Sequence, residues 1–292
     1  MKQKLLALAL AVVSASAAAS PIPAIPGGPL FIQFTNREQI AVAGTTGAVF
    51  GDAAEINWGV LLVSSITPGK LSILDPNVIN PSGGPFFSNV GSGGQITGIF
   101  YGIHASGPAT LSNPFPATAG FLDLYYRDLA SFSVTDISLA LPTLAGNGKR
   151  TALDKADGYT DGDFLVRLAF ASGIDPNPAI FIKGTTVPSF PSFAGFATSY
   201  ANVVTGLGGT LETKLDTDHF IPANNFGTRD LRFRNIYEEL SDWDGCTFGG
   251  GFCLGASSSD PATGVALPEP GSMALVGLGL LGVAAIRRRR IA

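Results

Sequence analysis

Four aspartates lie within ten residues of one another near the middle of the chain, with glycines between them: Asp154, Asp157, Asp161 and Asp163. Calcium takes about six to eight oxygen ligands from flexible backbone, so this stretch could form a calcium site with Asp157, Asp161 and Asp163 as ligands. The spacing differs from an EF-hand loop, and no glutamate closes it. We therefore favour the alternative, a solvated acidic turn before a strand that includes Phe164.

A second acidic group could act on carbohydrate. Glu238 and Glu239 precede Asp242 and Trp243, and a glycosidase needs two carboxylates that face each other. Aromatic rings that could stack on a sugar belong to Trp58, Tyr237 and Trp243. An exposed charged turn is the alternative interpretation, and it is the one that we favour.

The two histidines indicate no catalytic centre. Neither His104 nor His219 belongs to a G-x-S-x-G elbow or an H-E-x-x-H helix. The glycines between Gly91 and Gly94 are not followed by the lysine of a phosphate-binding loop. We assign no catalytic residue and expect a protein that is not an enzyme.

The chain has two cysteines, Cys246 and Cys253. In an exported protein they are expected to form a disulfide that closes a short loop. Such a bridge would stabilise the fold by roughly 2–3 kcal/mol on the chain-entropy model. A zinc site would need two further ligands, and neither histidine is close in sequence.

The N-terminus has the three parts of a secretory signal peptide. Lys2 and Lys4 precede an apolar stretch from Leu5 to Val13, and small residues follow. We predict cleavage between Ala19 and Ser20, because Ala17-Ala18-Ala19 fits the small-x-small pattern that signal peptidase reads. The apolar stretch is too short to span a membrane comfortably.

The C-terminus combines a rigid motif, an apolar segment and a basic end. Pro268-Glu269-Pro270 is followed by the apolar stretch Met273 to Ile286, which predicts a short transmembrane helix. Four arginines then follow: Arg287, Arg288, Arg289 and Arg290. Each arginine would cost about 2.5–3.5 kcal/mol at the bilayer centre, so the cluster should stop translocation.

This arrangement, from Leu267-Pro268-Glu269-Pro270-Gly271-Ser272 to the arginine cluster, resembles the PEP-CTERM sorting signal of exported bacterial proteins. The resemblance covers about residues 265–292; Trp58 to Val60, Gln95 to Gly102 and Ser259 to Pro261 are only loosely similar to bodies of such proteins. It implies export by the general secretory route, cleavage by signal peptidase and processing by an exosortase, a cysteine transpeptidase-like protease.

As a class, proteins with this signal are associated with the cell envelope and the exopolysaccharide matrix. The resemblance therefore implies a structural or interaction role at the cell surface or in the extracellular matrix, with exopolysaccharide as a possible partner. A secreted carbohydrate-active enzyme and a calcium-dependent adhesin are the alternatives.

The composition limits the partners of the part between the two signals. Residues 1–19 and 268–292 carry six of the 18 basic and one of the 22 acidic residues, so the remaining body has a formal charge of −9. This charge disfavours binding to nucleic acid and to anionic lipid. With 37 glycines, 20 prolines and only 14% charged residues, the composition favours a secreted β protein.

Short apolar or alternating runs separated by turn residues predict an antiparallel β-sandwich or irregular barrel over residues 20–255. We predict a small and polar stalk over residues 256–267, before the sorting signal at 268–292. The predicted strands are Leu30 to Phe34, Ile56 to Ile66, Gln95 to Ile103, Phe121 to Tyr126, Asp163 to Phe170, Gly209 to Asp216 and Leu231 to Arg234.

Overall fold

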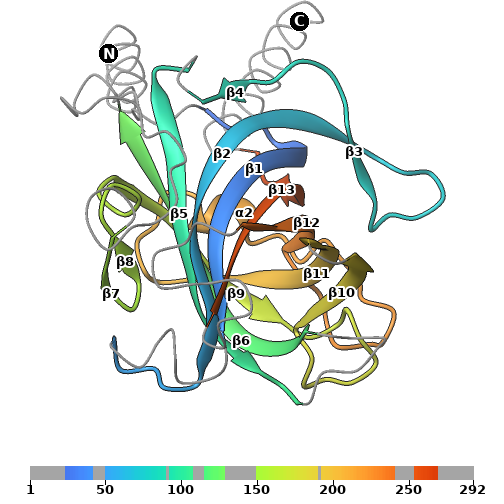
Figure 1. The fold of residues 1–292 in the computed structure, drawn as a ribbon. Coiled ribbons are helices and arrows are strands. Elements are labelled where there is room, and N and C mark those ends of the chain that lie inside the picture. Colours follow the sequence, from blue (N-terminus) through green and yellow to red (C-terminus); the bar gives the residue numbers. More distant parts are fainter. Residues whose placement is uncertain are drawn as a thin grey trace, which may run out of the picture.

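The computed structural model describes residues 24–41, 50–89, 92–107, 115–128, 149–189, 192–240 and 253–268. Nearly all of this chain is antiparallel β-sheet, and the sheet closes on itself as a barrel (Figure 1). The sequence prediction of a mainly β protein is confirmed, and of its two alternatives the structure is the barrel.

The barrel follows the chain from one neighbour to the next. β1 (Gly28–Ala41) pairs with β2 (Glu55–Leu71), β2 with β5 (Gly94–Ala105), and β5 with β6 (Phe115–Asp128). β9 (Asp163–Ala171) and β10 (Ile182–Ser189) share the next position, because each pairs with a different part of β6 and of β11 (Ser192–Val204). β12 (Leu231–Leu240) and β13 (Cys253–Ala266) complete the ring.

β13 closes the barrel and corrects one sequence prediction. It pairs with β1 along all 14 of its residues, from Cys253 opposite Ala41 to Ala266 opposite Gly28, and its other edge pairs with β12. The predicted stalk over residues 256–267, and the domain end at 255, were therefore wrong. Small and polar residues suggested a linker, but here their backbone groups are held by strands on both sides.

Two other local predictions differ from the structure. The predicted strand Ile56 to Ile66 is too short, because β2 continues through Pro68, which lies opposite Leu30, to Leu71. Residues Gly209 to Asp216 form no strand and contain the short helix α2 (Glu212–Leu215). The buried carboxylate of Glu212 accepts hydrogen bonds from the backbone N–H groups of Gly206, Leu207 and Gly209 at 2.7–3.1 Å, which bends this segment.

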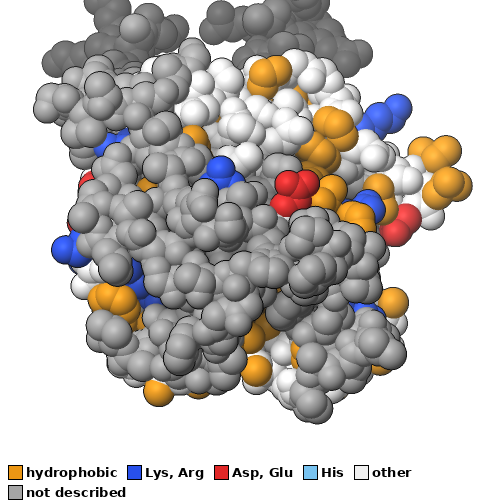
Figure 2. Space-filling model, viewed as in Figure 1, with side chains coloured by type: hydrophobic (Ala, Val, Ile, Leu, Met, Phe, Trp, Pro, Cys, Tyr) orange, Lys and Arg blue, Asp and Glu red, His pale blue; other side chains and the backbone are white. Residues whose placement is uncertain are grey.

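The barrel interior is the main hydrophobic core. Its buried side chains come from every part of the ring, for example Leu30, Phe34, Leu61, Phe100, Leu122 and Leu231. Beyond the barrel, β2 pairs with the short strands β3 (Ile79–Pro81) and β4 (Phe87–Ser88). The turn between β2 and β3 carries Ile73 and Leu74, which are 96% and 91% exposed, and hydrophobic side chains stand out on this turn at the right of Figure 2.

A second layer covers the outer face of β2 and β5. It contains β7 (Arg150–Ala152), β8 (Lys155–Ala156) and Tyr159, which packs with Trp58, Val60, Ile99 and Tyr101 in a separate cluster. β2 and β5 are therefore buried on both faces, which explains why the predicted strand Ile56 to Ile66 is almost continuously apolar.

A buried ion pair fastens this layer to the barrel. The Arg150 guanidinium donates to both carboxylate oxygens of Glu55 at 2.5 and 2.8 Å, and it lies over the Trp58 ring at 4.7 Å. Only 3% of the Arg150 side chain and none of the Glu55 side chain is exposed. Glu55 also accepts the N–H of Gly102 at 2.8 Å, so the pair joins the outer segment to both β2 and β5.

We predict that Arg150→Ala lowers the free energy of unfolding by about 3–5 kcal/mol, because it leaves the Glu55 carboxylate buried without its cation. Urea denaturation of the variant measures this loss. Lys155→Ala, in the same segment but exposed, is the control and should change stability by no more than about 0.5 kcal/mol. Equal effects of the two substitutions would contradict the role of the ion pair.

Candidate functional site

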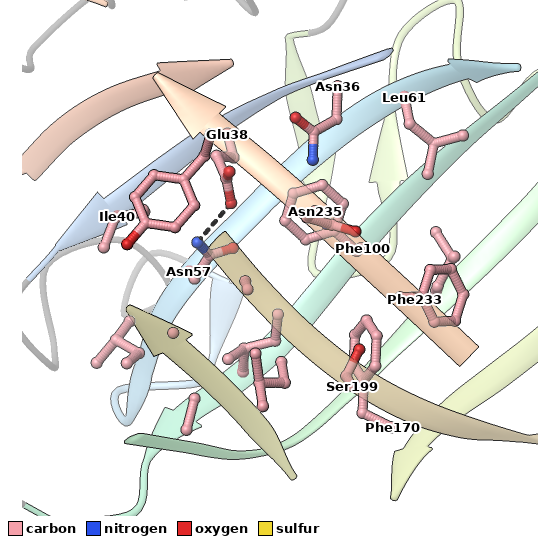
Figure 3. A pocket seen from close by; sticks show the side chains of 18 of the residues that line it. Asn36, Glu38, Ile40, Asn57, Leu61, Phe100, Phe170, Ser199, Phe233 and Asn235 are labelled. Carbon is pink, nitrogen blue, oxygen red and sulfur yellow. Dashed lines mark hydrogen bonds between the residues drawn. The ribbon is translucent and has the colours of Figure 1, made fainter. Parts of the chain in front are cut away.

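A cavity of about 100 Å³ lies inside the barrel and is lined by residues of β1, β2, β5, β6, β9, β10, β11 and β12 (Figure 3). Its apolar wall is formed mainly by Phe34, Leu61, Phe100, Leu122, Phe170 and Phe233. Its polar lining consists of Asn36, Glu38, Asn57, Ser199, Asn235 and Tyr237. The cavity is therefore amphipathic, which is the usual chemistry of a small-molecule site.

Strand alternation separates the two kinds of lining. Along β1 the cavity-lining residues are Phe34, Asn36, Glu38 and Ile40, every second residue of the strand. Along β12 the order is likewise aromatic and then polar, from Phe233 to Asn235. The apolar wall, which we call the apolar floor from here on, thus lies near the middle of the barrel. The polar lining residues form a polar belt nearer the end where Ala41 pairs with Cys253.

Glu38 is the ionisable centre of the polar belt. Its side chain is buried, and its Oε2 accepts a hydrogen bond from Asn57 Nδ2 at 2.8 Å (Figure 3). Burial raises the pKa of Glu38 above its usual 4.5, and the hydrogen bond from Asn57 only partly opposes this effect. The pKa of the Tyr237 phenol is also raised, first by burial and then by the nearby Glu38.

Two carbonyl oxygens of the belt are buried without a hydrogen bond. They are Oδ1 of Asn57 and Oδ1 of Asn235. An unsatisfied buried acceptor costs about 1–3 kcal/mol, so native proteins keep few of them without a reason. The polar belt therefore holds a carboxylate that accepts a side-chain hydrogen bond from Asn57, and two amide oxygens without a donor.

The acidic cluster of the sequence analysis lies elsewhere, in the outer layer. Asp161 accepts the N–H of Gly158 at 2.8 Å, and Asp154 lies 3.4 Å from Arg167, while Asp157 and Asp163 are exposed. Within the described ranges, no three His, Cys, Asp or Glu side chains are grouped so that they could hold a metal ion. The calcium site stays a prediction, and this arrangement offers it no support.

The proposed carbohydrate residues are only partly described. Trp58 is 5% exposed and donates from Nε1 to Gln39 Oε1 at 2.7 Å, so the suggestion that it stacks on a sugar was wrong. Tyr237 is also buried, and Glu238 is exposed. The side chain of Glu239, as well as Asp242 and Trp243, lies outside the described residues.

Each histidine contacts a residue that is distant in sequence. His104 Nε2 lies 2.8 Å from Asp52 Oδ2. Burial would raise the pKa of Asp52, but the hydrogen bonds from His104 and from the N–H of Ala54 bring it below its usual value. His219 Nε2 lies 3.3 Å from the Pro76 carbonyl oxygen, and its ring packs edge-on against Phe220.

Most residues of the two terminal signals, Ala19, Ser20, Glu269, Pro270 and Arg287 to Arg290, lie outside the described residues, as does Cys246. Cys253 begins β13, but its side chain is not described, so the disulfide stays a prediction. In the part of the chain that is described, no helix is long and apolar enough to cross a membrane. The predicted helix from Met273 to Ile286 falls outside that part.

The first proline of the sorting motif lies against the barrel. Leu267, directly after β13, donates its N–H to the Lys214 carbonyl at 2.8 Å. The backbone of Pro268 then approaches Gly27 so closely that a Cβ on Gly27 would lie 2.9 Å from the Pro268 Cα. The motif therefore begins where the barrel ends, without a spacer.

A family model for the PEP-CTERM protein-sorting motif matches residues 266–290. No curated protein and no solved structure matches the chain. The resemblance found in the sequence is thus confirmed: the chain carries a PEP-CTERM sorting motif. Such a motif implies an exported protein that an exosortase sorts to the cell envelope or surface.

Most of the polar residues that line the cavity lie outside the predicted strands. The predicted first strand ends at Phe34, although the alternation continues through Asn36 and Glu38 to Ile40. Polar residues at alternate positions normally indicate the solvent face of a strand. The available signal was the unbroken period of two from Leu30 to Ile40, which keeps Glu38 on the same face as Phe34.

We predict that Glu38→Gln stabilises the protein at neutral pH. Because the folded-state pKa of Glu38 lies above 4.5, its contribution to stability is fully present below about pH 4.5 and is lost as the pH rises through the folded-state pKa. The gain of the variant should be about 1.4 kcal/mol for each unit of that difference in pKa.

Urea unfolding of both proteins between about pH 4 and pH 9 measures this gain. The difference in the free energy of unfolding should grow with pH above about 4.5 and then level off. A difference that does not change with pH would show that Glu38 titrates in the folded protein as it does in the unfolded chain.

Proposed function

We propose that this chain is an exported protein with a non-enzymatic interaction role at the cell surface or in the extracellular matrix. Its C-terminus would hold it transiently at the membrane until an exosortase processes it. The observation that carries the proposal is the sorting motif at residues 266–290. It begins with Ala266, the last residue of the strand that closes the barrel.

The proposed topology uses both termini. A signal peptide over residues 1–19 would be removed by signal peptidase after Ala19. The span from Met273 to Ile286 would then stay in the bilayer, with Arg287 to Arg290 on the cytoplasmic side. Since Ala266 and Met273 are seven positions apart along the chain, the barrel end would stand within roughly 25 Å of the bilayer.

Strand pairing supports this arrangement. Gly28 lies opposite Ala266, so the chain enters and leaves the barrel at the same end. Glu38 is ten residues further along β1, which places it roughly 33 Å along the strand from that end. In this topology the cavity would face away from the membrane, where a ligand or matrix component can reach it.

The charge and the exposed side chains of the protein are compatible with a non-enzymatic role. The acidic body favours neutral or cationic partners, and exopolysaccharide is one candidate. Ile73 and Leu74 form an exposed apolar pair on a projecting turn, where a partner would be able to contact them. No observation on the described residues favours a glycan hydrolase built on Glu238 or a calcium-dependent adhesin.

We predict that replacing Pro268, Glu269 and Pro270 by alanine in the full chain abolishes exosortase processing. The two prolines fix extended backbone and remove two N–H donors, which suits a strand-like protease substrate. Mass spectrometry of the C-terminus of protein from membrane, surface and medium fractions measures the effect. The unchanged chain should lack Arg287 to Arg290 outside the membrane fraction, and the triple variant should keep them.

Thr213→Ala is the control, because Thr213 is an exposed residue of α2 outside the matched segment and its substitution should leave processing unchanged. Mature unchanged protein that still ends beyond Arg290 would contradict the proposal. So would normal processing of the triple variant.

A further inference from the structure

We propose that the barrel cavity binds a small organic amine. The primary ammonium group would lie at Glu38, Asn57 and Asn235, and a short alkyl chain would lie among Phe34, Phe100 and Phe233. This inference goes beyond sorting and retention, because it assigns a ligand to the barrel itself.

The polar belt selects the head group. The Glu38 carboxylate lines the cavity together with Asn57 and Asn235, each of which has a buried Oδ1 without a hydrogen bond (Figure 3). An ammonium group has three donors and no acceptor, so it can pair with the carboxylate and has donors left for neighbouring acceptors. A hydroxyl brings one donor, and a carboxylate brings none.

The charge of the cavity lining points the same way. Among the described residues that line the cavity there is no Lys or Arg, and the Glu38 carboxyl is buried. A cationic ligand would provide the positive charge that balances the buried carboxylate.

The apolar floor sets the size of the rest of the ligand. An apolar cavity of about 150 Å³ binds benzene. The cavity here is about 100 Å³, which suits a slimmer chain of about four carbons. Each methylene group that is buried against the apolar floor should strengthen binding about fourfold.

The test is calorimetric titration of the full chain with n-butylammonium, compared with ethylammonium, 1-butanol and butyrate. We expect n-butylammonium to bind about fifteenfold more tightly than ethylammonium, because two methylenes are added. We expect 1-butanol to bind at least tenfold more weakly than n-butylammonium, and butyrate to give no measurable heat.

Variants locate the site. Glu38→Gln should weaken n-butylammonium at least tenfold while changing 1-butanol less than threefold, since only the charge is removed. Asn235→Leu, which removes an unsatisfied acceptor, should weaken the amine at least threefold and keeps the test valid if the first variant folds poorly. Asp216→Asn removes an exposed carboxylate near Lys214, at the other end of the barrel, and should leave binding unchanged.

Several results would overturn the proposal. These are no binding of n-butylammonium to the unchanged chain, butyrate or 1-butanol binding as tightly as the amine, or equal amine affinity in the unchanged chain, Glu38→Gln and Asn235→Leu. An equal loss in Asp216→Asn and Glu38→Gln would also overturn it, because the effect would then reflect net charge and not the cavity.

Discussion

Pairing between β1 and β13 is the constraint on which the rest of this structure depends. It joins the first and last strands of the barrel along 14 residues and leaves neither with a free edge at the point of closure. Exposed strand edges promote aggregation, and closure removes this hazard where β1 and β13 meet. The same pairing encloses the cavity and sets the position of the sorting motif, which starts at the last residue of β13.

The two buried carboxylates of Glu55 and Glu38 differ in how completely they are paired. In the outer layer, Glu55 has Arg150 as a bidentate partner and contributes to holding the segment on the barrel. Inside the barrel, Glu38 has a single amide donor from Asn57, and two amide oxygens nearby have no donor. The first arrangement is complete and serves stability. The second is incomplete without a ligand, as expected of a site that sacrifices stability for binding.

The sequence predicted the strands that carry strong local signals. The runs Ile56 to Ile66 and Gln95 to Ile103 are long and apolar because both faces of β2 and β5 are covered, and Asp163 to Phe170 alternates clearly. The C-terminal sorting motif was also predictable, since its three parts are contiguous in sequence. Closure by β13 was not, because Gly, Ala and Ser have weak strand preference and are held there by neighbours distant in the chain. The period of two along β1 places Glu38 on the same face as Phe34, but only long-range pairing closes the barrel around them, so the cavity itself could not be predicted from the sequence.

Hydrogen–deuterium exchange of the full chain, followed by mass spectrometry of peptides from residues 253–266, tests barrel closure most directly. Amides bonded in the middle of a closed barrel should exchange as slowly as those of β5, through global unfolding. Exchange of the 253–266 peptides within seconds, while β5 stays protected, would mean that this segment is a free tether. The enclosed cavity and the position of the sorting motif against the barrel would then be lost together.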